Sequence, residues 1–195
     1  MHPLHHMSLF KFKKSVQALN YFAQKEGGEI NYMKAGKLIY LADRAHLRTY
    51  GRTITNDIYI AMKNGSVPSK TKDIILKSAW FEQEILDYVN AFLSDPQNYS
   101  FRSLDDVDQT VFSKTDLKIM DEIYSYYGER DQYELSAYSH NFPEWQRFEN
   151  ELKLGVGKAF LIDPNDFFEN GLSDEPFSQS EELLSLSKKQ FQHIL

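Results

Sequence analysis

The chain has 195 residues, of which 42% are hydrophobic and 14% are aromatic. This composition supplies enough apolar surface for one folded domain and excludes a chain that is disordered throughout. There is no cysteine, so disulfide bonds and thiolate chemistry are excluded as well. No apolar run approaches the roughly 18 residues that span a membrane, and the N-terminus lacks the basic and apolar segments of a signal peptide. We therefore expect a cytoplasmic protein.

The net charge of −6 is divided unevenly along the chain. Residues 1–80 carry 13 Lys and Arg against 5 Asp and Glu, whereas residues 81–195 carry 9 against 23. Such a split is typical either of two halves that neutralise each other or of one face polarised for a charged partner. The acidic half would repel phosphate, which weighs against nucleic acid as that partner.

Two helices are expected in the first 50 residues. Residues 8–26 carry apolar side chains at the three-to-four spacing of an amphipathic helix. Residues 31–50 repeat this spacing, with Asn31 placed to cap the first turn and Gly51 placed for the left-handed position after the last one. These signals predict a helical pair with well-defined ends.

The apolar pattern changes to a period of two between residues 53 and 62, which is typical of a strand. We expect residues 53–56 to pair with residues 59–62 in a small hairpin that turns at Asn56-Asp57. Asn64-Gly65 gives a strong turn signal after it. A hairpin this short must pack against the helices to be stable.

The remaining chain reads as further helices separated by loops. Helices are expected near residues 68–79, 113–128, 131–141, 143–152 and 181–195, and a Ser-x-x-Asp capping box at Ser113 marks one start. Residues 80–112 are ambiguous: Phe81, Ile85 and Val89 have helical spacing, which Asp95-Pro96 ends. The predicted fold class is mainly α (α+β): a compact helical domain of about six or seven helices with a small β-hairpin between helices 2 and 3. We expect residues 1–7 to be disordered or non-native, residues 8–162 to form the domain, and residues 163–195 to add an acidic loop and a C-terminal helix packed on it.

Asp43, His46 and Tyr50 follow one another at helical spacing, so one face of the second helix can carry all three. They could form an acid–imidazole–phenol relay in which the carboxylate fixes the tautomer of the histidine. They could equally form a polar strip that holds the helix to the following hairpin through buried hydrogen bonds. The second interpretation is favoured because no Ser or Cys nucleophile is signalled nearby.

Basic and aromatic side chains around the same helix are candidates for binding a partner. Arg44 and Arg48 lie one turn apart and Arg52 follows Gly51, so they form either a solvated basic face or an anchor for an acidic protein surface. Tyr50 and Tyr59 could supply aromatic anchors beside them.

Two other kinds of site are weaker hypotheses. A helix-turn-helix over residues 8–50 would use Lys34, Lys37, Arg44 and Arg48, but Tyr32 and Met33 occupy the turn that should read bases. A metal site is not expected, because His46 and His140 lack the closely spaced ligand pairs of zinc sites. No cofactor is indicated.

The segment from Lys37 to Ser69 resembles the signature of the Panacea (SocA-like) antitoxin domain, a family common in bacteria and phages. The matching positions are Lys37, Tyr40, Ala42, Asp43, His46, Tyr50, Gly51, Tyr59, Ala61, Gly65, Val67 and Pro68. A second block, SHNFPEW, carries His140, Pro143 and Trp145 where the family has Ser-His followed by Pro-Trp. Ser66 stands where the family usually has Pro, and Asn56 where Gly is common, which puts the local turn geometry in question.

The resemblance implies a phage-associated or bacterial antitoxin of a type II-like toxin–antitoxin system. Such a protein would neutralise a cognate toxin by direct protein–protein binding, or hand it to a protease as an adaptor, and would not be an enzyme. It also makes Asp43, His46, His140 and Trp145 the polar residues of the family motif. Two alternatives remain: a phage-associated regulator that binds nucleic acid, and an uncharacterised enzyme that uses Asp43, His46 and His140.

Overall fold

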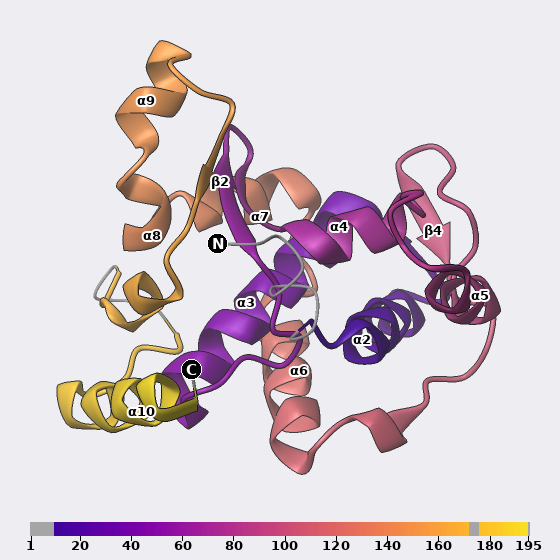
Figure 1. The fold of residues 1–195 in the computed structure, drawn as a ribbon, viewed down its shortest axis with the longest axis horizontal. Coiled ribbons are helices and arrows are strands. Elements are labelled where there is room, and N and C mark those ends of the chain that lie inside the picture. The colour runs from indigo at the N-terminus through magenta and orange to yellow at the C-terminus, as the bar shows by residue number, and fades with distance from the viewer. Residues whose placement is uncertain (1–9, 172–175, 195) are drawn as a thin grey trace.

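The computed structural model describes residues 10–171 and 176–194, so the predicted segment 1–7 lies outside the described residues. This part contains nine α-helices and two 3-10 helices (Figure 1). The α-helices are α2 (Phe12–Lys25), α3 (Tyr32–Tyr50), α4 (Ser69–Ile75), α5 (Gln83–Phe92), α6 (Lys114–Tyr127), α7 (Gln132–Ser139), α8 (Pro143–Gln146), α9 (Glu149–Leu154) and α10 (Glu181–Ile194). The 3-10 helices are η1 (Gln109–Val111) and η2 (Pro164–Phe168), and the strands are β1 (Glu29–Asn31), β2 (Tyr59–Met62), β3 (Gly65–Pro68), β4 (Ser100–Arg102) and β5 (Ala159–Leu161).

The predicted fold class is confirmed: the protein is mainly helical, with two small antiparallel sheets. The helix count exceeds the expected six or seven, partly because the segment after Pro143 is divided into α8 and α9. No helix of the described residues has both the length and the apolar character needed to cross a membrane.

Helix α3 occupies the middle of the molecule, with α2, α6, α7 and α10 packed around it (Figure 1). Asn31 Oδ1 accepts hydrogen bonds from the backbone N–H groups of Met33 and Lys34, and Gly51 ends the helix with φ +65°. Both predicted end signals are therefore confirmed. A side chain at residue 51 would collide with α10, since a Cβ there would lie 2.6 Å from the carbonyl oxygen of Ser187.

The hairpin pairs residues 59–62 with a different segment from the predicted one. Its strands are β2 and β3, which pair Tyr59 with Pro68 and Met62 with Gly65, so the turn lies at Lys63-Asn64. The prediction of a turn at Asn56-Asp57 is wrong because Asp57 has another role. Its carboxylate accepts hydrogen bonds from the backbone N–H groups of Lys70 and Thr71, at the start of α4.

A third strand joins the hairpin from far along the chain. Strand β5 pairs antiparallel with β2, which gives the order β3-β2-β5 and sets Ala61 opposite Phe160. The second sheet pairs β1 with β4 and sets Ile30 opposite Phe101. Both sheets thus connect the middle or end of the chain to segments that flank α3.

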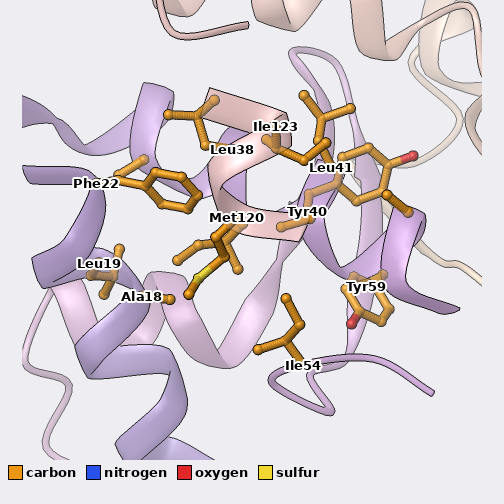
Figure 2. Close-up of a cluster of buried hydrophobic side chains, with 14 of the residues drawn as sticks. Ala18, Leu19, Phe22, Leu38, Tyr40, Leu41, Ile54, Tyr59, Met120 and Ile123 are labelled. Atoms are coloured by element: carbon orange, nitrogen blue, oxygen red, sulfur yellow. The ribbon is translucent and has the colours of Figure 1, made fainter. Parts of the chain in front are cut away.

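The core lies between α2, α3 and α6 and extends to the hairpin (Figure 2). Phe22, Leu38 and Met120 are fully buried where the three helices meet. Tyr40 and Tyr59 continue the cluster on the hairpin side, with their ring centroids 6.4 Å apart. Each large side chain buried in this way contributes about 1.5–3 kcal/mol to the free energy of unfolding.

Candidate functional site

Asp43 lies in the interior and receives hydrogen bonds from the segment that follows α3. Its carboxylate accepts from the backbone N–H groups of Ile54 at 2.7 Å and Thr55 at 2.9 Å, and from the Tyr59 hydroxyl at 2.9 Å. The Thr55 hydroxyl donates a further hydrogen bond to it. Burial raises the pKa of Asp43, and these hydrogen bonds oppose that rise. The carboxylate therefore fixes residues 54–59 against the helix.

His46 is also fully buried, but it faces different partners. Its Nδ1 lies 2.7 Å from the Arg52 carbonyl oxygen, and its Nε2 lies 3.1 Å from both the Thr115 hydroxyl and Asp116 Oδ1. Burial by itself would raise the pKa of Asp116, yet hydrogen bonds from His46 and Lys14, together with the charge of Arg52, hold it well below its usual range. This cluster joins α3 to the start of α6.

The relay of Asp43, His46 and Tyr50, the less favoured of the two interpretations, does not form. The hydrogen-bond partners of Asp43 lie at residues 54–59, and those of His46 lie at Arg52 and on α6. The Tyr50 ring packs against His46 with a centroid separation of 4.8 Å. The geometry is that of a polar strip that holds α3 to its neighbours.

The two arginines predicted to bind a partner are interior residues. Arg44 is 2% exposed; its Nε lies 2.7 Å from Glu144 Oε1, and its guanidinium lies over the Phe142 ring. Arg48 is fully buried and donates to the carbonyl oxygens of Phe167 and Glu169 and to Asn170 Oδ1.

The predicted partner-binding surface is therefore incorrect for three of its five residues. Arg44, Arg48 and Tyr59 form no such surface: their polar groups bond to Glu144, to residues 167–170 and to Asp43, and none of the three lines the groove described below. Tyr50 and Arg52 keep part of their surface, and their role in binding stays a prediction.

His140 and Trp145 form a stacked pair next to the hairpin. Their ring centroids are 3.8 Å apart with an interplanar angle of 16°, and Trp145 Nε1 donates to the Met62 carbonyl oxygen at 2.9 Å. Burial and the nearby charge of Lys37 lower the pKa of His140. His46 lies instead beside α6, so the two histidines do not share a cleft.

A groove with a volume of about 1390 Å³ opens next to this stacked pair. Its walls come from the first turns of α3, the β2–β3 hairpin, α4, the Asn98-Tyr99 loop, the start of α7, and α9 with the residues after it. His140 and Trp145 line it, and so does Lys37 from α3.

Lys37 lies in the wall of the groove and is only 2% exposed. Its Nζ donates to the Ser66 carbonyl oxygen at 2.6 Å. Burial lowers the pKa of Lys37 to about 7. The hairpin can come this close because residue 65 is glycine: a Cβ at Gly65 would lie 2.7 Å from Lys37 Nζ and 1.9 Å from Ser139 Oγ.

The sequence comparisons decide the family. The family model described as "Antitoxin SocA-like, Panacea domain" matches residues 36–146, which is more than half of the chain. The chain belongs to this family. The searches of curated proteins and of solved structures return no match. The predicted resemblance is thus confirmed, and the Panacea match ends at Gln146, within α8.

The Panacea motif residues fall into two sets in space. Tyr40, Asp43, His46 and Tyr59 build the interior, whereas Lys37, Val67, Pro68, His140 and Trp145 line the groove. Sequence reasoning missed Glu144 and Asp116 as ion-pair partners of Arg44 and Arg52, although Glu144 lies inside the second motif block and Asp116 inside the predicted capping box. It named Lys37 as a motif residue and for a possible helix-turn-helix, but not among the residues that bind a protein partner.

Proposed function

We propose that this protein is an antitoxin that silences a cognate toxin by direct protein–protein contact. The observation that carries the proposal is the Panacea match over residues 36–146. It is supported by the way the motif divides, because one set of motif residues builds a rigid interior and the other lines an open groove. A preformed surface of this kind suits a protein that acts by binding.

The residues that suggested an enzyme or a nucleic-acid-binding regulator are largely buried. An enzyme using Asp43, His46 and His140 would need them around one solvent-accessible point, but Asp43 and His46 are fully buried and hydrogen-bonded within the fold. The basic face of a helix-turn-helix would need Arg44 and Arg48 exposed, and both are buried. Binding without catalysis is therefore the function that we favour.

Co-expression with the neighbouring open reading frame tests the proposal. The neighbouring gene alone should arrest growth, and co-expression of this protein should restore it, with the two products co-purifying as a complex. Asp106→Ala, a change at an exposed side chain, serves as the matched control and should protect equally well. A neighbour that is harmless alone, or a toxin that stays active beside this protein, would contradict the proposal.

The level of the toxin separates the two modes of neutralisation. If the antitoxin acts by binding alone, the toxin should persist in an inactive complex. If it acts as an adaptor, the toxin should disappear in wild-type cells and reappear in cells that lack the responsible protease. Both results require the same physical contact, so both support the proposed function.

A further inference from the structure

Lys37 is a buried amine that no carboxylate of the described residues compensates. Its Nζ donates to the neutral Ser66 carbonyl oxygen, and burial lowers its pKa. An ammonium group removed from water without a counter-charge is costly unless something supplies that charge. Arg44, on the same helix, has Glu144 for this purpose. Lys37 lies in the wall of a groove instead.

The rest of the groove is basic as well. Lys63, Lys72 and Lys158 line it with exposed side chains, and none of them forms an ion pair with another described residue. Lys153 lies 2.9 Å from Glu149, the one acidic residue in the lining. The groove is therefore positive although the whole chain carries a net charge of −6.

Large apolar side chains stand open to solvent along the same walls. Tyr99 is 71% exposed, Tyr133 is 69% exposed, and Leu76 is 47% exposed, and all three line the groove. Aromatic side chains left exposed beside basic groups are typical anchors of protein–protein interfaces. The groove is also larger than most pockets that hold a single small ligand.

We propose that this groove binds an extended acidic segment of the partner polypeptide, with one of its carboxylates docked against Lys37 Nζ. The exposed lysines attract the other acidic side chains, and Tyr99 and Tyr133 hold apolar ones. This assignment rests on the proposed antitoxin function, since it names the part of the toxin that the antitoxin holds.

A peptide fits the groove better than nucleic acid does. The groove combines lysines with exposed Tyr99, Tyr133 and Leu76, which matches a polypeptide that mixes carboxylates with apolar side chains. A nucleic acid would instead present one phosphate at every nucleotide.

Binding of short synthetic peptides to the full-length protein tests the assignment. The probes are a fluorescein-labelled peptide in which Asp and Glu alternate with Phe and Leu, the same peptide with Lys at the acidic positions, and single-stranded oligothymidine. The acidic peptide should bind at least about tenfold more tightly than either control probe, a difference of about 1.4 kcal/mol. Tighter binding of the basic peptide or of the oligonucleotide would overturn the assignment.

Charge-reversal variants show whether the acidic peptide binds in the groove. The triple change Lys63→Glu, Lys72→Glu, Lys158→Glu should weaken binding of the acidic peptide at least about tenfold. The control triple Lys114→Glu, Lys118→Glu, Lys189→Glu changes the net charge equally at exposed positions outside the groove. It should leave the affinity within a factor of about three. An equal loss in both triples would mean that the attraction is nonspecific and would overturn the assignment.

Lys37→Met tests the docking of the carboxylate. It keeps the apolar stem and removes the amine, so the acidic peptide should bind more weakly while circular dichroism shows an unchanged helix content. Unchanged affinity in a folded variant would contradict a role for Lys37 Nζ. Should this variant not fold, the two triple variants still decide the location of the groove.

The two proposals can fail separately in the co-expression experiment. If the wild-type protein and the groove triple both suppress the toxin, the antitoxin function stands and the groove assignment is wrong. If the wild-type protein suppresses no neighbouring product but binds the acidic peptide through the groove, the proposed function is wrong and the groove assignment stands.

Discussion

The two ends of α3 differ in whether every buried charge has a partner within the protein. Toward its C-terminal end, Asp43, Arg44 and Arg48 each meet partners supplied by the protein itself. Toward its N-terminal end, Lys34 is paired with Glu26, but Lys37 has only a carbonyl oxygen beside the groove. Removing one partner of a complete buried pair destabilises the fold, whereas a buried charge without a counter-charge is a candidate for binding a ligand. The difference separates the structural residues of the motif from those available for binding.

The largest loss of stability is expected from Asp43→Ala, in the C-terminal half of α3. This change leaves the Thr55 and Tyr59 hydroxyls and two backbone N–H groups without their acceptor. Because each orphaned buried donor costs about 1–3 kcal/mol, the free energy of unfolding should fall by at least about 3 kcal/mol. Urea denaturation followed by circular dichroism measures it. The exposed control Asp106→Ala should stay within about 0.5 kcal/mol of the wild type, and a similarly small loss for Asp43→Ala would show that the network is dispensable.

A smaller effect is expected where the hairpin meets the groove, from Gly65→Ala. The added Cβ would collide with Ser139 Oγ and Lys37 Nζ, and the backbone is held at φ +89°. Gly27→Ala is a matched control, since Gly27 has φ +86° but no atom within 4 Å of its added Cβ. Both changes carry a backbone cost of about 1–2 kcal/mol, and overpacking should add about 1–3 kcal/mol at residue 65 alone.

Thermal unfolding compares the two glycine variants directly. Replacing Ser139 by Ala in the Gly65→Ala background should recover part of the extra loss, because it removes the atom in closest contact. Equal destabilisation of the two single variants would mean that the hairpin does not need its close approach to α3 and α7.

A pH dependence, small over any single pH unit, sets Lys37 apart from the rest of the helix. The pKa of Lys37 is about 7 in the folded protein and about 10.4 in an unfolded chain, so the unfolded state binds more protons between these values. The free energy of unfolding should therefore rise with pH from about 7 toward 10, by at most about 1.4 kcal/mol per pH unit. His140, which faces Lys37, has a pKa lowered from 6.5 and titrates below this window.

Lys37→Met should remove this rise. Subtracting the stability curve of the variant from that of the wild type cancels the titration of the other groups. A difference curve that is flat from pH 7 to 9 would show that the amine is not desolvated as the structure indicates.

Local signals in the sequence allowed the helix ends to be predicted. Asn31, Gly51 and the Ser113–Asp116 capping box act over a few residues, so the sequence alone reveals them, and the structure contains all three. The prediction of the hairpin failed because residues 56–65 contain two turn signals. Asp57 caps α4, thirteen and fourteen residues ahead of its partners, so the turn forms at the second signal.

Contacts between distant segments could not be predicted. The sequence around Arg44 and Arg48 does not show that Glu144 and the segment 167–170 cover them. It therefore predicts a basic surface where the structure has two buried cations. The pairing of β5 with β2 joins segments about a hundred residues apart for the same reason. The motif identified the important residues of α3, but only the packing shows which of them face inward and which face the groove.

The guanidinium of Arg48 also bears on how the protein is made. Its acceptors at Phe167 and Asn170 lie 119 and 122 residues further along the chain. At about 5–20 residues per second, a ribosome that has just added Arg48 needs roughly 6–24 s to add them. Until then the arginine must remain in water, and the surrounding helix cannot acquire its final neighbours. The groove is likewise complete only late in synthesis, since its lining extends to Lys158.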